Sequence, residues 1–334
     1  MHAFAQRAGS FAVDHTHGQD AALAAFGEVV RQQIGEFVRA KCVQVQLAGD
    51  GNLNRLVIER FGIVVHRRIG GSTMIRIALA AIVFAVAAFS AEPVQIRFSG
   101  QPGPYSVERW KKDWPGCEWE DGVHEGHVSM VERDSKNWLR VTYAVGEIGP
   151  EKCGCGWRFP IGMHDSAELR YTVRFSKDFD WVKGGKLPGL CGGPENVSGG
   201  RPATGTNGFS ARLMWRADGR GEAYVYHKNQ ADNYGDRLSF PADFRFPTET
   251  PIRVRMRVTM NDPGKRNGKL YVWITPGADA EQLVVSRTNI EWRSVDTFGV
   301  DSVYFETFHG GSDKTWAPTK QCSAEFGEMR VDSQ

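Results

Sequence analysis

Alternation of apolar and polar residues with a period of two is the feature that most constrains the fold of this chain. From residue 168 to residue 175 every odd position is apolar and every even position is polar or charged. A similar alternation returns over residues 252–258 and 269–275. Successive side chains of a β-strand point to opposite faces, so each segment predicts a strand with one buried face.

Turn signals separate these strands. Asp-Gly, Asn-Gly and Pro-Gly pairs recur along a chain with 38 Gly, 15 Pro and 10 Trp residues, and long helical periodicity is missing after about residue 90. Short strands punctuated in this way predict an all-β sandwich or jelly roll. With no internal repeat and no linker after residue 95, we expect one domain over residues 91–334.

Length and charge set further bounds. The chain has 334 residues, 41% of them hydrophobic, which is ample for a large core. Its formal net charge is only +2, so affinity for a polyanion must come from local clusters of Arg and Lys. We expect a monomer with no nucleic-acid partner.

Residues 74–90 have the layout of a secretory signal peptide. Arg76 precedes an apolar run over residues 77–89, and small residues suit cleavage after Ser90. Because a signal peptide acts from a chain's N-terminus, we expect translation to start at Met74. Residues 1–73 would then be an upstream extension or a mis-assigned start, and the mature protein would be secreted and not membrane-bound. A buried apolar helix and a genuine N-terminal extension are the alternatives.

Cysteine usage gives no metal signal. An odd number of cysteines follows residue 90, so at least one thiol stays free or pairs between chains even if export permits disulfides. Cys153 and Cys155 resemble half of a zinc site but lack a matching second pair. We therefore predict neither a metal nor a cofactor.

Residues 209–227 predict a β-hairpin, because two strand-like runs flank the turn sequence Ala217-Asp218-Gly219. If Arg216 pairs with Arg220, four polar side chains share one face and small apolar side chains occupy the other. We expect this quartet to line an exposed concave surface. Its members are Ser210 opposite Tyr226 and Arg212 opposite Tyr224.

The quartet suits elimination from a uronic acid. Arg212 can bind a carboxylate through two donors and so stabilise the charge that develops when the neighbouring C5 proton is removed. A tyrosine beside fixed positive charge should have a lowered pKa, which makes it a candidate base or acid. Which tyrosine takes which role stays open, and an ordinary amphipathic hairpin is the alternative.

The string KGGKLPGLCGG at residues 183–193, combined with the spacing of the quartet, resembles polysaccharide lyase family 14 and the related glucuronan lyases. The segment FHGGSDKTWAP at residues 308–318 extends the resemblance to roughly residues 95–332. It implies a β-jelly-roll, a concanavalin-like sandwich, and β-elimination on alginate or polyglucuronate to unsaturated oligosaccharides. The implied catalytic residues are Lys186, Ser210, Arg212, Tyr224 and Tyr226.

Two departures from the family pattern leave assignments open. Lys183 competes with Lys186 for the family lysine, and His309 stands where an apolar residue is expected. Further substrate-binding candidates are Arg255, in a cationic stripe, and Tyr271 with Trp273, which could stack on sugar rings at the cleft or simply pack on the surface.

Two other functions compete with the lyase. A non-catalytic module that binds an acidic polysaccharide would use the same fold, although the lysine and the paired tyrosines argue for chemistry. A glycoside hydrolase needs two carboxylates, and Glu222 has no evident partner. The preferred uronate and the choice between endo and exo cleavage stay open.

Overall fold

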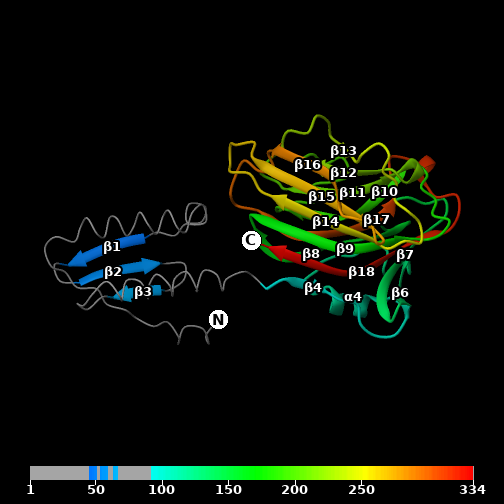
Figure 1. Ribbon diagram of the computed structural model, residues 1–334, viewed down its shortest axis with the longest axis horizontal. Helices are drawn as coiled ribbons and strands as arrows, with labels where there is room; N and C mark the ends of the chain where they lie inside the picture. Colours follow the sequence, from blue (N-terminus) through cyan, green and yellow to red (C-terminus); the bar gives the residue numbers. More distant parts are fainter. Residues whose placement is uncertain (1–44, 51–52, 59–62, 67–91, 334) are drawn as a thin grey trace. The chain divides into compact units, whose positions relative to one another are not determined.

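The computed structural model describes residues 45–50, 53–58, 63–66 and 92–333 (Figure 1). The chain forms two compact units, Met1–Phe89 and Ser90–Gln334. The expected signal segment, residues 74–90, lies outside the described residues. Among the residues that are described, no helix is long and apolar enough to cross a membrane. In the first unit three strands form an antiparallel sheet in the order β1-β2-β3: β1 (Val45–Asp50), β2 (Leu53–Ile58) and β3 (Ile63–His66).

The second unit is built from two antiparallel sheets, as the all-β prediction required (Figure 1). The six-stranded sheet has the order β13-β12-β11-β10-β17-β8. Its strands are β8 (Gly154–His164), β10 (Gly184–Gly192), β11 (Phe209–Arg216), β12 (Gly221–Tyr226), β13 (Asp236–Ser239) and β17 (Val300–His309).

The second sheet of this unit has the order β16-β15-β14-β9-β18-β7-β6-β5, and β4 also pairs with β18. We call it the nine-stranded sheet. Its strands are β4 (Val94–Ile96), β5 (Gly103–Pro104), β6 (Val128–Arg133), β7 (Lys136–Tyr143), β9 (Ser166–Phe175), β14 (Ile252–Thr259), β15 (Gly268–Pro276), β16 (Gln282–Ile290) and β18 (Cys322–Ser333). Short helical elements are α4 (Val107–Asp113), η3 (Ala217–Gly219) and η4 (Lys314–Trp316).

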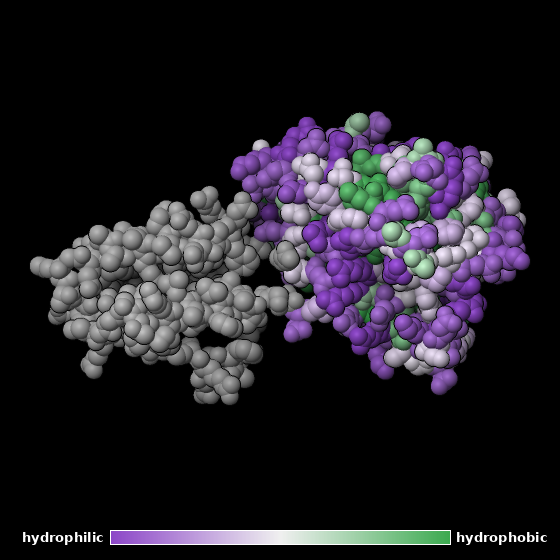
Figure 2. Space-filling view, in the orientation of Figure 1, coloured by the Kyte–Doolittle hydropathy of each residue, from purple (hydrophilic) through white to green (hydrophobic). Residues whose placement is uncertain are grey.

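The period-two pattern explains how the sheets meet. In β14 the residues Ile252, Val254, Met256 and Val258 are buried, while the arginines between them face outward. The inner faces of the two sheets enclose an aromatic core in which Trp157 stacks on Phe305 at 4.5 Å between ring centres. The surface turned to the viewer in Figure 2 is correspondingly mostly hydrophilic. The predicted alternation and the predicted β-jelly-roll sandwich are confirmed.

Three of the cysteines in this unit, Cys153, Cys155 and Cys322, belong to the hydrophobic core. All five cysteines within residues 92–333 are free thiols, and Cys153 and Cys155 are completely buried. Burial raises the pKa of Cys153 to about 11, which keeps its thiol protonated and unreactive. Among the described residues, no group of three or more His, Cys, Asp or Glu could hold a metal ion.

Candidate active site

The hairpin β11–β12 has the predicted register. Arg212 lies opposite Tyr224 and Ser210 opposite Tyr226. The Arg216 N–H donates to the carbonyl of Arg220 at 2.7 Å, which closes the turn. Asp218 has a φ of 60°, in the left-handed region that Asp tolerates better than most residues. The local turn chemistry therefore fixes which side chains share a face.

The quartet is buried, so the expected exposed surface is wrong. Ser210 and Arg212 are 1% exposed, Tyr226 is 0% exposed and Tyr224 is 8% exposed. The cause is the segment 193–208 between β10 and β11, which we call the cover loop. The carbonyl oxygen of Val197 in this loop accepts a hydrogen bond from the Ser210 hydroxyl at 2.7 Å. Its Gly200 N–H donates to the Tyr226 hydroxyl at 3.2 Å.

The glycine-rich motif in β10 has a packing explanation. A Cβ on Gly189 would lie 2.0 Å from the carbonyl oxygen of Ala211, and one on Gly185 would lie 2.1 Å from the Trp215 ring. Only glycine at these two positions of β10 therefore allows β11 to lie as close to β10 as it does. The pairing register of β10 shifts between Leu187 and Leu190, where Pro188 interrupts the ladder. Bulges of this kind often lie beside active sites, where they redirect side chains.

Lys186 projects from β10 onto the quartet. Its Nζ lies 3.6 Å from the centre of the Tyr224 ring and donates to Met214 Sδ at 3.0 Å. Burial, together with the nearby positive charges of Arg212 and Arg216, holds the pKa of Lys186 well below its ordinary value. A lysine in these surroundings is a candidate proton acceptor, because its neutral amine forms at a lower pH than that of an exposed lysine.

Tyr224 has a raised pKa, which corrects the expectation of a lowered one. Burial and the hydrogen bond with Tyr226 raise the pKa of Tyr224, and the nearby Arg212 only partly opposes them. The Tyr224 and Tyr226 rings lie edge to face, 5.5 Å apart. Tyr224 therefore keeps its proton and is suited to act as a donor.

Arg212 is poised to bind an anion. Its Nη1 donates to the carboxylate of Glu306, and its guanidinium lies 4.6 Å from the centre of the Tyr304 ring. Among the described residues, its buried Nε and Nη2 have no hydrogen-bond partner. Buried donors without partners are rare and costly. Two unpaired N–H groups on one guanidinium match the two oxygens of a carboxylate.

Sequence reasoning missed the residues of β17 that support Arg212. Glu306 is buried, and the Tyr304 hydroxyl donates to Asn196 Oδ1 at 2.9 Å, which ties the strand to the cover loop. The period-two pattern places Ser302, Tyr304 and Glu306 on one face. That signal identifies the face, but it gives no indication that the Glu306 carboxylate pairs with Arg212.

The lysine and histidine of the family motifs have different surroundings. Lys183 is exposed and donates to Thr315 Oγ1 at 2.5 Å, so Lys186 is the lysine beside the quartet. His309 is 0% exposed in the core, where its Nε2 donates to the Asp180 carbonyl at 2.6 Å. Burial lowers the pKa of His309 to about 4. The prediction that His309 binds substrate is therefore wrong.

Arg255, Tyr271 and Trp273 do not line the same groove as the quartet. They lie on β14 and β15 of the nine-stranded sheet, with their side chains on its outer face. The Arg255 guanidinium lies 3.7 Å from the centre of the Trp273 ring, and Tyr271 stacks on Trp273 at 5.6 Å. The prediction that Tyr271 and Trp273 stack on sugar rings at the cleft is wrong, because period-two alternation fixes the face of a strand but not its sheet.

Comparisons with known proteins bear on the family and the fold of this chain. The family model described as Polysaccharide lyase 14 matches residues 131–329. A PL-14 alginate lyase from Aplysia kurodai is 25% identical, with 72% of this chain and 98% of that chain covered and a TM-score of 0.64. Alginate lyase Aly36B is also 25% identical, with coverages of 72% and 96% and a TM-score of 0.62. A search of curated proteins finds no match.

Proposed function

Because this chain belongs to the polysaccharide lyase 14 family, we propose that it cleaves a uronic-acid polymer, alginate or polyglucuronate, by β-elimination. The observation that carries this proposal is the pair of buried, unpartnered N–H groups on Arg212. The two related structures named above are alginate lyases, which supports an acidic polysaccharide as the substrate.

Arg212 would supply the cation that elimination requires. Removal of the proton on C5 places negative charge on the adjacent carboxylate, and the guanidinium neutralises that charge through two hydrogen bonds. The surroundings are dry, so each hydrogen bond is stronger than it would be in water. The carboxylate of Glu306 accepts a hydrogen bond from Nη1 of Arg212, so Nε and Nη2 of Arg212 are left to bind the substrate.

Lys186 and Tyr224 would move the protons. The neutral amine of Lys186 takes the C5 proton, and the electrons of the C5–H bond form the C4–C5 double bond. The C4–O4 bond breaks, and the Tyr224 hydroxyl donates its proton to O4. The pKa of Lys186 is lowered and that of Tyr224 is raised, so both shifts favour the protonation states that these roles need. Proton transfer from Lys186 to the Tyr224 phenolate then restores the site.

Access to the site requires the cover loop to move. Val197 and Gly200 hydrogen-bond to Ser210 and Tyr226, so the hydroxyl groups of these two residues can contact a polymer only after these bonds break. Ser210 and Tyr226 would then exchange their partners in the cover loop for substrate hydroxyl groups.

The proposal extends to location. The signal-like segment 74–90 supports secretion of a protein that starts near Ala91 and has no membrane attachment after cleavage, and we propose that this protein is a monomer.

The deciding experiment is incubation with alginate and with polyglucuronate while the ultraviolet absorbance of the unsaturated product is recorded. We expect absorbance to rise with at least one polymer, and the Arg212→Lys variant to serve as the matched control because it keeps the charge but loses the planar fork. Binding of either polymer without any absorbance would overturn the lyase and favour a non-catalytic binding module.

A further inference from the structure

A pocket of about 270 Å³ opens on the outer face of the nine-stranded sheet, where β6, β7, β18 and β9 are neighbours. The quartet is on the outer face of the other sheet, so the two sites lie on opposite faces of the sandwich. We call this hollow the arginine pocket. It is lined by Arg133, Arg140, Arg174, Phe175, Ser176, Lys177, Glu249, Ser323 and Glu325.

One buried carboxylate holds the three arginines. Glu325 accepts from Arg133 Nη2 at 2.9 Å, from Arg140 Nη2 at 2.6 Å and from Arg174 Nη1 at 3.3 Å. Three positive charges therefore surround one negative charge. Lys177 and Glu249 add one charge of each sign, so the pocket keeps an excess of two positive charges.

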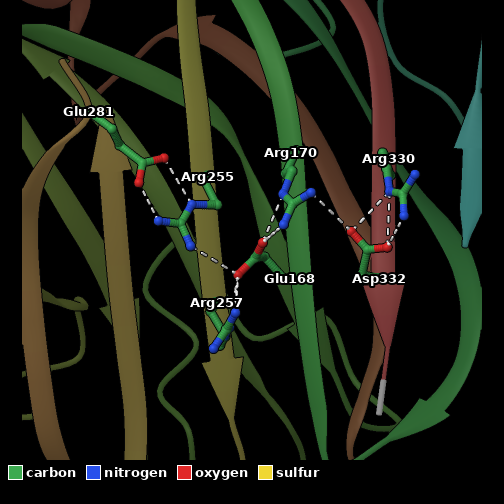
Figure 3. A network of polar contacts seen from close by, with 7 residues as sticks. All are labelled: Glu168, Arg170, Arg255, Arg257, Glu281, Arg330 and Asp332. Carbon is green, nitrogen blue, oxygen red and sulfur yellow. Dashed lines mark hydrogen bonds and ion pairs between the residues drawn. The ribbon is translucent and has the colours of Figure 1, made fainter. Parts of the chain in front are cut away.

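A second buried glutamate on the same sheet provides an internal comparison (Figure 3). Glu168 is also surrounded by three arginines, Arg170, Arg255 and Arg257. There, further carboxylates complete the network: Glu281 pairs with Arg255, and Asp332 pairs with Arg170 and Arg330. Four guanidiniums meet three carboxylates, and the outward charge is nearly balanced. The lining of the arginine pocket has two carboxylates, Glu249 and Glu325, against four cations, and the further carboxylate of Asp134 acts on Arg133 from outside the lining.

The arginines of the pocket also have donors to spare. Within residues 92–333, Nη1 of Arg133, Nη1 of Arg140 and Nη2 of Arg174 make no hydrogen bond. The Ser176 hydroxyl accepts from the Ser323 N–H and keeps its own proton free to donate. The pocket therefore combines excess positive charge, guanidinium donors and a hydroxyl.

We propose that the arginine pocket binds a carboxylate-bearing sugar of a polyuronate chain and anchors the enzyme to its polymer on the face opposite the active site. A volume near 270 Å³ is many times the roughly 10–15 Å³ in which a single water molecule fits, which is more than a lone inorganic anion needs. Guanidiniums recognise carboxylates through paired donors. The identity of the ligand rests on the proposed function, whereas its anionic character rests on the pocket alone.

The test compares two matched double variants by retardation in native gels that contain polyuronate. Arg133→Gln with Lys177→Gln removes two positive charges from the pocket, and Arg257→Gln with Lys269→Gln removes two from the same face of the same sheet. Both are made in a Tyr224→Phe background so that the polymer stays intact. We expect the first pair to weaken polyuronate binding about fivefold or more, and the control pair to change it less than twofold.

Further gels with other polymers show which anionic group the pocket recognises. Dextran sulfate tests whether sulfate esters serve as well as carboxylates, and neutral dextran tests for retention without charge. Equal retardation of the two double variants on polyuronate would overturn the proposal, as would dependence on the pocket with dextran sulfate alone. Lys177 is exposed, so Lys177→Gln alone provides a reading if the double variant fails to fold.

Product formation is measured separately with the parent protein. If the parent forms no unsaturated product but only the pocket variant loses retardation, the proposed lyase fails and the anion-binding pocket stands. If the parent cuts the polymer and the two double variants bind it equally, the lyase stands and the pocket does not.

Discussion

Replacing Glu306 with glutamine should unmask an uncompensated charge in the candidate active site. Glu306→Gln keeps the shape and one acceptor oxygen but removes the negative charge that faces Arg212. The side chains of Arg212 and Glu306 are 1% and 8% exposed, so solvent screens their attraction only weakly. Breaking such a buried pair costs about 3–5 kcal/mol.

This cost translates into a measurable shift in unfolding temperature. For domains of 150–250 residues, 1 kcal/mol shifts Tm by about 2–4 °C, so we expect Glu306→Gln to lower Tm by about 6–20 °C in a calorimetric scan. The matched control is Glu328→Gln, which breaks the exposed pair with Arg97. An exposed pair is worth at most about 1 kcal/mol, so this control should lower Tm by no more than about 4 °C.

A ligand measurement separates the roles of Glu306. If Arg212 binds the substrate carboxylate, a short oligouronate supplies the missing negative charge, so the ligand should raise the Tm of Glu306→Gln more than that of the parent. A Tm within about 2 °C of the parent would refute the idea that Glu306 neutralises Arg212. An equal ligand-induced shift in both proteins would show that the carboxylate binds elsewhere.

Four further predictions address the reaction and the processing of the chain. Tyr224→Phe should keep its parental Tm and lose activity about a hundredfold or more, whereas Tyr226→Phe should lose less; similar rates for the parent and Tyr224→Phe would remove Tyr224 from the reaction. Arg212→Lys should lower kcat/KM about a hundredfold through loss of the planar fork, as initial rates of absorbance increase will show. The parental kcat/KM should rise with pH as Lys186, whose pKa is lowered, loses its proton, and should fall only above the ordinary tyrosine pKa, because Tyr224 has a raised pKa; Lys186→Ala should abolish the acidic limb. N-terminal sequencing of exported protein should begin near Ala91, and any retained residue from 1–73 would contradict an internal start.

The strands could be predicted because their signals are local. Alternation over residues 168–175 and 252–258 marks which side chains face the core, and the turn at Ala217-Asp218-Gly219 fixes the pairing of β11 with β12. These inferences need only the two-residue period and the geometry of a tight turn. The assignment of strands to sheets depends on long-range pairing, which local patterns do not reveal. The sequence therefore could not show that Tyr271 and Trp273 lie on the nine-stranded sheet rather than on the sheet that carries the quartet.

The site was less predictable because its surroundings come from distant segments. The cover loop has no periodicity, so nothing in the sequence shows that Val197 and Gly200 bury the quartet. The ion pair between Arg212 and Glu306 joins residues that are 94 positions apart. His309 illustrates the opposite error: a polar residue in a family motif is a core residue, because the Asp180 carbonyl accepts a hydrogen bond from its Nε2.

Burial of the quartet also explains why its protonation states differ from those of an open groove. In water, the positive charge of Arg212 would lower a tyrosine pKa, but in the closed site the desolvation of Tyr224 outweighs this effect. The same burial lowers the pKa of Lys186. Desolvation acts against the charged form of each group, so it leaves an amine that can accept a proton beside a phenol that can donate one. The cover loop, which buries the quartet, therefore helps to set the chemistry as well as the access.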